Sequence, residues 1–320
     1  MLGVAVGDAL GAPLEFMTAE EIKSRHGIVR DMLGGGWLNV EPGEVTDDTQ
    51  MTLAVAGGIL ANPKDPIPEI GKYFIKWYDS QPKDIGNACR TTIGYAKEYN
   101  AADAKGWYKA ARRFHDETGG QTAGNGALMR TIYPALYYGN GRPDCALSIA
   151  CMTHVHEHSR RSVTAYTQAV VDLTSTDNST EWGKERIEYH VKNVRELIDE
   201  SKLKPSGYAP ESLICAANAI RDTSSFEDAL IYAVNLGGDA DTIGAITGGL
   251  AGALYGGRNI PLRWINELAN EPNRGKRNAD NFMARMLTDI AQIAYAERTG
   301  KPMAAVQFGE NSIKKFFEKF

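Results

Sequence analysis

Residues 224–256 read SSFEDALIYAVNLGGDADTIGAITGGLAGALYG, and this stretch discriminates between fold classes. Ser224 and Glu227 have the spacing of a helix-capping box. Apolar residues then recur at helical spacing until a glycine ends the pattern. The second half, 243–254, consists of small and apolar residues and follows a pair of aspartates. Two successive helices with no alternating strand between them favour an all-α fold.

The same periodicity recurs along the chain, which extends the all-α prediction to its whole length. The apolar helical faces are Ile67/Ile70/Phe74/Trp77, Ile187/Val191/Val194/Ile198, Phe226/Leu230/Val234 and Phe282/Met286/Ile290/Ile293. Thr18 with Glu21 forms a second capping box. Segments rich in glycine, serine, threonine, asparagine or proline are expected loops: 34–45, 119–126, 175–182 and 202–210. We expect one domain, 1–320, with residues from about 301 as a C-terminal extension. Its last residues, 314–320, form either a docked amphipathic turn or a frayed end.

Composition excludes several classes of protein. Of the 320 residues, 43% are apolar and 23% charged, as in soluble globular proteins. The net charge of -5 argues against a nonspecific nucleic-acid binder. No uncharged run reaches the length of a membrane span, and the N-terminus lacks a basic segment. Four unpaired cysteines indicate reduced thiols and a cytoplasmic protein: Cys89, Cys145, Cys151 and Cys215.

Two acidic clusters precede expected helices, TDDT at 46–49 and GGDADT at 237–242. Adjacent carboxylates repel one another and are costly to bury unless a cation compensates them. Carboxylate and hydroxyl ligands without histidine or cysteine suit Mg²⁺ or Mn²⁺. The simpler alternative is helix N-capping, which favours the same residue types. Two clusters of matching composition favour the metal site.

Other motifs leave alternatives open. Glu15 lies in GDALGAPLEF, 7–16, where burial would raise its pKa and suit acid–base chemistry, although a surface glutamate is the simpler interpretation. The segment GNGALMR, 124–130, is either a phosphate cradle or a plain turn. Arg130 either assists a pyrophosphate or anchors a helix. The run of alternate histidines at 154–158 has no further soft ligand nearby and does not favour zinc.

The assembled motifs closely resemble the ADP-ribosylglycohydrolase family, in its branch of dinitrogenase reductase-activating glycohydrolases. The matching segments are GVAVGDALGAPLEFMT (3–18), GGGWLNVEPGEVTDDTQM (34–51), DIGNACR (84–90), AGNGALMR (123–130), MTH (152–154), SGY (206–208) and GGDADTIGAITGGLAGALYG (237–256). The resemblance implies an all-α orthogonal helical bundle with a central cleft that holds two divalent cations. It also implies removal of ADP-ribose from ADP-ribosylated arginine on a protein, with nitrogenase iron protein as the candidate target.

The resemblance also implies roles for individual residues. Glu15 and Asp84 match catalytic carboxylates of the family. Its metal ligands match Thr46, Asp47, Asp48, Asp239, Asp241 and Thr242. Its ADP-ribose contacts match Asn87, Gly124, Asn125, Gly126, Met129, His154 and Tyr208. The expected partners are an ADP-ribosylated protein and the product ADP-ribose, without nucleic acid or stable membrane insertion.

Some features depart from the branch and bear on the protein substrate. The stretch 119–122 reads GGQT where the branch has acidic residues, Pro210-Glu211 follows the SGY segment, and the chain continues past Gly300. Two alternatives remain open. One is a non-catalytic relative that binds ADP-ribose or resembles lens crystallins, which the intact acidic motifs disfavour. The other is a phosphotransferase of the haloacid dehalogenase type, which would need a hydrophobic strand at 229–236.

Overall fold

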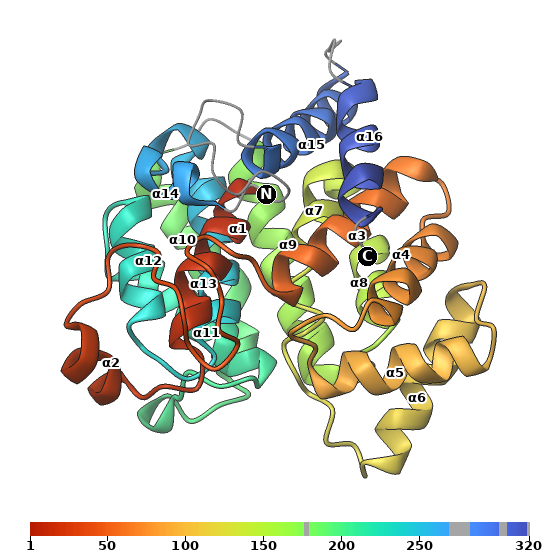
Figure 1. The fold of residues 1–320 in the computed structure, drawn as a ribbon, viewed down its shortest axis with the longest axis horizontal. Coiled ribbons are helices and arrows are strands. Elements are labelled where there is room, and N and C mark those ends of the chain that lie inside the picture. Colours follow the sequence, from red (N-terminus) through yellow and green to blue (C-terminus); the bar gives the residue numbers. More distant parts are fainter. Residues whose placement is uncertain (176–178, 269–281, 301–305, 319–320) are drawn as a thin grey trace.

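The computed structural model describes residues 1–175, 179–268, 282–300 and 306–318, which form helices joined by loops (Figure 1). In these ranges no strand occurs, and backbone pairing outside the helices includes three isolated bridges. The prediction of an all-α fold is confirmed. The α-helices are α1 (Leu2–Gly11), α2 (Ala19–His26), α3 (Asp47–Ala61), α4 (Ile67–Asp79), α5 (Asn87–Glu98), α6 (Ala104–Glu117), α7 (Ile132–Tyr138), α8 (Pro143–Ala150), α9 (Glu157–Ser175), α10 (Thr180–Arg195), α11 (Ala209–Arg221), α12 (Phe226–Val234), α13 (Ala240–Tyr255), α14 (Leu262–Glu267), α15 (Phe282–Thr299) and α16 (Val306–Phe317). Short 3-10 helices are η1 (Ala12–Leu14), η2 (Gly139–Gly141), η3 (Glu200–Lys202) and η4 (Gly257–Asn259).

The predicted apolar faces form the core of the molecule. All four residues of the α4 face and all three of the α12 face are buried, as are the described residues of the α15 face. Ile198 is half-buried beyond the end of α10, and the side chain of Phe282 lies outside the described residues. Because 229–234 is helical, the strand that a haloacid dehalogenase fold requires is absent from this segment.

Helix boundaries differ from the predictions at several places, including the predicted loop 202–210, whose ends belong to η3 and α11. The capping box at Thr18 and Glu21 is present, with each side chain accepting from the other residue's backbone N–H. The cap of α12 is Ser225, whose hydroxyl accepts the N–H of Asp228, so the prediction at Ser224 was one residue too early. The loop predicted at 175–182 was too long, since helices include Ser175 and 180–182.

Helices α1 and α13 pack against each other without intervening side chains. The Cα atoms of Gly3 and Gly7 face the carbonyl groups of Gly248 and Gly244, so that a Cβ on either glycine would overlap backbone atoms. Gly11 meets 240–241 in the same way. The two helices are therefore antiparallel, and the carboxyl end of α1 lies beside the amino end of α13 (Figure 1).

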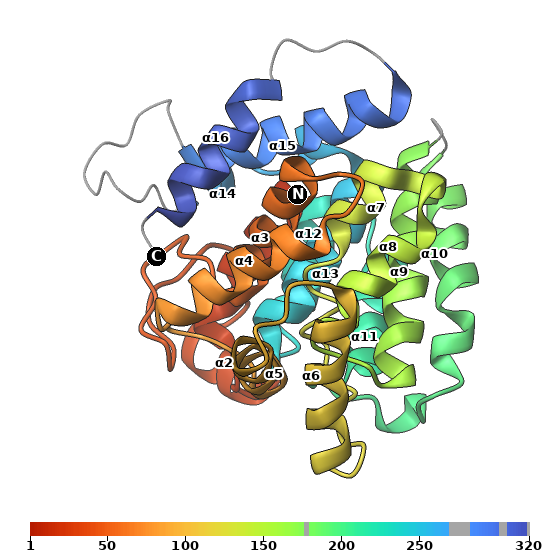
Figure 2. The same cartoon turned by 90° about the vertical axis from the view of Figure 1, so that its right-hand side faces the viewer.

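The C-terminal helices dock on the rest of the chain. Figure 2 shows α15 and α16 together along one edge of the molecule. The ring of Phe317 lies 4.9 Å from that of Tyr73 on α4, and Ile313 is fully buried beside Gly57 of α3. The tail therefore forms a docked helix through Phe317.

The predictions of unpaired cysteines and of no membrane-spanning helix can be compared with the structure. The four cysteines are free, with Cys151 half-buried and the other three buried. Among the described residues, no helix combines the length and hydropathy that crossing a bilayer requires.

Candidate functional site

Three carboxylates from distant parts of the sequence meet where α1 ends and α13 begins. Glu15 follows η1, Asp84 precedes α5, and Asp241 lies in the first turn of α13. One oxygen of each lies within 4.8 Å of the others. Glu15 and Asp241 are only 9% and 1% exposed, so Glu15 is a buried residue and not a surface glutamate.

Asp8 fixes the amino end of α3 against α1. Its carboxylate accepts the backbone N–H groups of Thr46 and Thr49, each at 3.1 Å. It also accepts their hydroxyl groups at 2.9 and 2.5 Å. Four donors thus satisfy one fully buried carboxylate, which holds the adjacent aspartates of α3 beside the end of α1.

Helix capping does not account for the two acidic clusters. Thr46 and Asp239 are the N-cap residues of α3 and α13, yet neither side chain makes a capping hydrogen bond. The Thr46 hydroxyl instead donates to Asp8 at 2.9 Å and lies 3.4 Å from Oδ2 of Asp48, to which the Thr242 hydroxyl donates at 3.3 Å. The other oxygen of Asp48, Oδ1, is buried without a hydrogen-bond partner. An orphaned carboxylate oxygen of this kind needs a cation or a proton.

Burial and mutual repulsion raise the pKa values of the cluster. Desolvation is the larger cause for Glu15, whose pKa rises to about 8 despite the hydrogen bond from Trp37. The same cause raises the pKa of Asp8 to about 6. Desolvation first, and neighbouring carboxylates next, raise the pKa values of Asp47, Asp48 and Asp241 well above their usual range. The group carries more negative charge than its protein surroundings compensate, although two helix amino ends point toward it.

These features fit a hard divalent cation. The donors are carboxylate and hydroxyl oxygens, which Mg²⁺ and Mn²⁺ prefer. The unpartnered Oδ1 of Asp48 is a ready ligand, and a bound cation would return these carboxyl groups to their ionised form.

A glycine-rich segment is tied directly to the acidic cluster. The amide of Asn125 donates to Oδ2 of Asp239 at 2.7 Å and to the hydroxyl of Ser212 at 2.9 Å. Its backbone N–H donates to the carbonyl of Gly207 at 2.9 Å, and Gly124 pairs with Tyr208 as an isolated bridge. The predicted ADP-ribose contacts at 124–126 and at Tyr208 therefore lie side by side next to the second aspartate cluster.

Comparison with known proteins agrees with these features. The sequence profile described as ADP-ribosylglycohydrolase matches residues 1–300. The chain belongs to the ADP-ribosylglycohydrolase family. The resemblance seen in the sequence motifs is confirmed, and with it the prediction of a glycohydrolase enzyme.

Curated relatives and a solved structure extend this result over most of the chain. The ADP-ribosyl-[dinitrogen reductase] glycohydrolase of Rhodospirillum rubrum is 35% identical over 289 residues, which cover 88% of this chain and 94% of the relative. An ADP-ribosylarginine hydrolase of Serratia proteamaculans is 29% identical over 292 residues, covering 85% and 74%. A solved ADP-ribosylglycohydrolase-related protein complex superposes with a TM-score of 0.73 at 28% identity, covering 93% of this chain and 96% of that one.

Within this glycohydrolase, Arg130 holds the glycine-rich segment in place through hydrogen bonds. It is fully buried, and its guanidinium donates to the carbonyl of Gly126 and to the hydroxyl of Thr153 at 2.6 Å. The Thr153 hydroxyl also lies 2.7 Å from Nδ1 of His154, with which it shares a hydrogen bond. The second nitrogen of His154, Nε2, lies on the side of Gly124. Of the two roles considered for Arg130, the structure favours the anchor.

The remaining predicted residues of the glycohydrolase lie around this segment. Asn87 is exposed as the first residue of α5, and Met129 is buried. The phenol of Tyr208 lies 2.6 Å from Nδ1 of His158. Their contacts with ADP-ribose stay predictions.

Sequence reasoning missed two residues of the site. Asp8 lay inside a quoted motif without a role, although an aspartate within ten otherwise apolar or small residues signals a buried partner. Trp37 donates its indole N–H to Glu15 at 2.5 Å, and nothing in its local sequence announces that contact.

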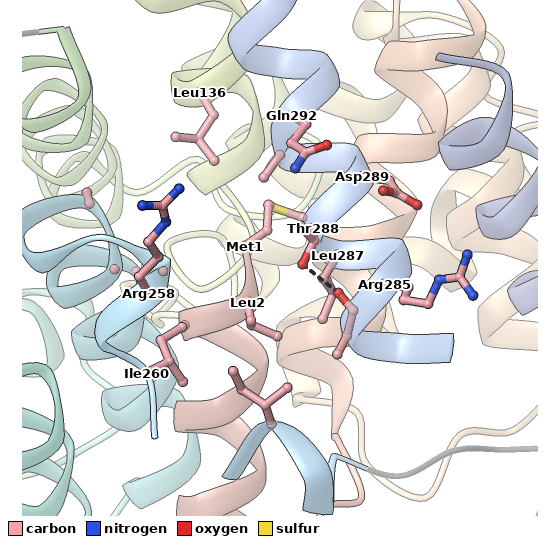
Figure 3. A pocket seen from close by; sticks show the side chains of 18 of the residues that line it. Met1, Leu2, Leu136, Arg258, Ile260, Arg285, Leu287, Thr288, Asp289 and Gln292 are labelled. Atoms are coloured by element: carbon pink, nitrogen blue, oxygen red, sulfur yellow. Dashed lines mark hydrogen bonds between the residues drawn. The ribbon is translucent and has the colours of Figure 1, made fainter. Parts of the chain in front are cut away.

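A cavity elsewhere in the molecule is separate from this site (Figure 3). It has a volume of about 1280 Å³ and is lined by Met1, Leu2 and residues of α7, α13 and α15. None of the predicted site residues lines it. Its lining is mainly apolar, and it carries no cluster of carboxylates, so it is not the candidate for glycoside chemistry.

Proposed function

We propose that this protein is a metal-dependent hydrolase that removes ADP-ribose from ADP-ribosylated arginine on a protein. The observation that carries the proposal is the meeting of Glu15, Asp84 and Asp241 within 4.8 Å of one another. Asn125 joins this group to the glycine-rich segment through Asp239. A carboxylate group beside a candidate phosphate cradle is what hydrolysis at the ribose end of ADP-ribose requires.

The cations would be held by the two aspartate clusters. We assign Thr46, Asp47, Asp48, Asp239, Asp241 and Thr242 as ligands of two divalent cations, Mg²⁺ or Mn²⁺. When bound, such ions supply positive charge that binds hydroxyl groups and lowers the pKa of water. Asp8 is not a ligand in this scheme, because its oxygens are already occupied by four donors from Thr46 and Thr49.

Glu15 and Asp84 would divide the proton transfers. The bond to be broken joins ribose C1″ to a guanidine nitrogen, through a transition state with oxocarbenium character. A guanidine leaves only in its protonated form because it is strongly basic. Asp84, whose pKa is raised by burial, would hold a proton on the leaving-group side. Glu15 would orient the attacking water and accept its proton.

Neutral donors would bind the pyrophosphate. Burial lowers the pKa of His154 to about 3, so its ring is uncharged at neutral pH. Its Nε2 faces Gly124 and would donate in the tautomer that carries the hydrogen on this nitrogen, beside the backbone N–H groups of the glycine-rich segment. Anion binding by oriented neutral donors allows ADP-ribose to leave after hydrolysis more readily than binding by a buried cation.

The proposal also names a candidate protein that carries the ADP-ribosylated arginine. The relative in Rhodospirillum rubrum acts on dinitrogen reductase by its name, which makes the nitrogenase iron protein our candidate. The loop 119–122 and Glu211 differ from that branch and flank the site. In this structure Glu211 accepts a hydrogen bond from Ser206, next to the Gly207–Tyr208 segment of the cradle.

The test is turnover on two synthetic peptides that carry ADP-ribose on arginine or on serine. We expect Mn²⁺-dependent release of ADP-ribose from the arginine-linked peptide in preference to the serine-linked one, and a large loss of that activity in Asp84→Asn. Full activity in excess EDTA would refute the metal dependence. Equal cleavage of both peptides, or an unimpaired Asp84→Asn enzyme, would refute the arginine assignment. An inactive wild type that still binds ADP-ribose would support the non-catalytic alternative.

A further inference from the structure

Two exposed aromatic side chains lie at the acidic cluster and have no role in the scheme above. Phe16 is 68% exposed and Trp37 is 54% exposed, and their rings are 5.3 Å apart with an interplanar angle of 46°. Single exposed apolar side chains are common on protein surfaces. Two of them in contact beside a buried catalytic carboxylate indicate a binding surface.

The backbone holds Phe16 outward at a conformational cost. Its φ of 64° lies in the left-handed region, which is unusual for a bulky side chain. The conformation is locked because the N–H of Phe16 donates to the carbonyl of Gly238 at 2.7 Å, and the N–H of Gly238 donates to Met17 at 2.7 Å. Such locked strain is typical of functional positions.

Trp37 is held just as firmly by a tight turn. Gly35 and Val40 exchange backbone hydrogen bonds at 2.7 and 2.9 Å, and Gly36 packs on the backbone of Pro13. The indole N–H at the tip donates to Oε2 of Glu15 at 2.5 Å. The nitrogen edge of the ring therefore faces the carboxylate, while more than half of the side chain remains accessible.

We propose that Trp37 and Phe16 form the subsite that receives the arginine side chain of the substrate. The inference rests on the proposed function and names the residues that recognise its leaving group. A guanidinium binds well on the face of an indole ring and pairs with carboxylates at its edge. This surface offers both, because Glu15 hydrogen-bonds Trp37 and lies within 4.8 Å of an oxygen of Asp84.

The two functions of Trp37 can be separated by substitution. Trp37→Phe keeps an aromatic face but removes the N–H that positions Glu15. Trp37→Leu removes both, and Phe16→Leu removes the second ring alone. Tyr189→Leu is the matched control, since this aromatic side chain on α10 is 66% exposed and lies outside the site.

Binding is measured with N-acetylarginine amide and with its uncharged analogue N-acetylcitrulline amide, both in the presence of ADP-ribose. Isothermal titration calorimetry measures this binding without turnover and without a reporter side chain that the substitutions at Trp37 would remove. Inhibition of ADP-ribose release by each compound gives a second value of its affinity. We expect the arginine compound to bind and the citrulline compound to bind at least several-fold more weakly.

The variants should then divide as follows. Trp37→Leu and Phe16→Leu weaken the arginine compound by about 3–30-fold, the range for a cation on an aromatic face. Trp37→Phe lowers kcat while its affinity for that compound stays within about 3-fold of wild type, and Tyr189→Leu changes neither. Unchanged affinity in Trp37→Leu, or equal binding of the two compounds, overturns the subsite. Wild-type binding of the arginine compound without cleavage of arginine-linked peptide would instead count against the proposed function alone.

Discussion

Replacing Gly11 by alanine tests whether the contact between α1 and α13 sets the geometry of the site. Gly11 is the last residue of α1, four residues before Glu15, and it faces the first turn of α13. A Cβ there would lie 2.6 Å from Cα of Asp241 and would also overlap the carbonyl of Ala240. The substitution adds one methyl group and removes no polar contact.

The expected losses of stability and turnover follow from the 2.6 Å distance between the added Cβ and Cα of Asp241. Non-bonded carbon atoms prefer a separation of about 3.5–4.0 Å, so the two helices must separate by roughly 1 Å. The obstacle is backbone, which cannot rotate away, and overpacking of this kind costs about 1–3 kcal/mol of the free energy of unfolding. Because Glu15 and Asp241 sit on the two sides of the contact, the displacement passes directly into the site. A misplacement of about 1 Å can lower turnover by about 10²-fold.

Urea unfolding and turnover on an arginine-linked peptide measure the two effects. Gly252→Ala is the control in the same helix pair, because its Cβ would meet nothing closer than 3.9 Å. Alanine is the better helix former, so this control should be stabilised by about 0.5–1 kcal/mol and retain activity. A Gly11→Ala protein with wild-type stability and turnover would refute the claim that this contact positions the carboxylates.

Three further results are expected. Glu15→Gln should lower turnover by about 10²–10⁴-fold with little change in ADP-ribose affinity, measured by steady-state kinetics and calorimetry; near-normal turnover would leave Glu15 a structural residue. In EDTA the melting temperature should fall as the pH rises from about 5 to about 8. Glu15 and Asp8 have raised pKa values in the folded protein, so the folded state binds more protons than the unfolded chain in this range and loses stability as they ionise. Saturating Mn²⁺ should remove the fall, and a flat profile in EDTA would contradict the prediction. Asp48→Asn should abolish the rise in melting temperature that Mn²⁺ causes, and an unchanged rise would exclude Asp48 as a ligand.

The helices could be predicted from the sequence because their signals are local. The period of Ile67, Ile70, Phe74 and Trp77 reports one buried face, and all four side chains are buried. Cap positions are less secure, since serines at 224 and 225 offer nearly equal hydroxyl groups one residue apart. The end of the chain could not be assigned, because a docked and a frayed amphipathic turn have the same sequence pattern. Docking depends on the surface of α3 and α4 that Ile313 and Phe317 meet.

The site was predictable in its chemistry but not in its assembly. A single aspartate cluster before a helix is compatible with capping or with a cation, but two clusters of matching composition favour the cation site. That the segments around Glu15, Asp84 and Asp241 converge came from the resemblance to the family, not from spacing. The contacts that assemble them are long-range and leave weak local signals. Asp8 bonds residues about forty positions away, and Trp37 reaches Glu15 from a separate turn.

The way this site is assembled links its chemistry to its stability. Helix α1 approaches α13 through glycines, and Asp8 draws the amino end of α3 to the same place. Each of these contacts brings further negative charge into a buried volume, which raises pKa values and opposes folding. A cation or protons that compensate this charge therefore stabilise the folded state at neutral pH. A ligand that binds only the folded protein stabilises it in proportion to the logarithm of its concentration. The same carboxylates that would carry the reaction should therefore make the folded state depend on divalent cations.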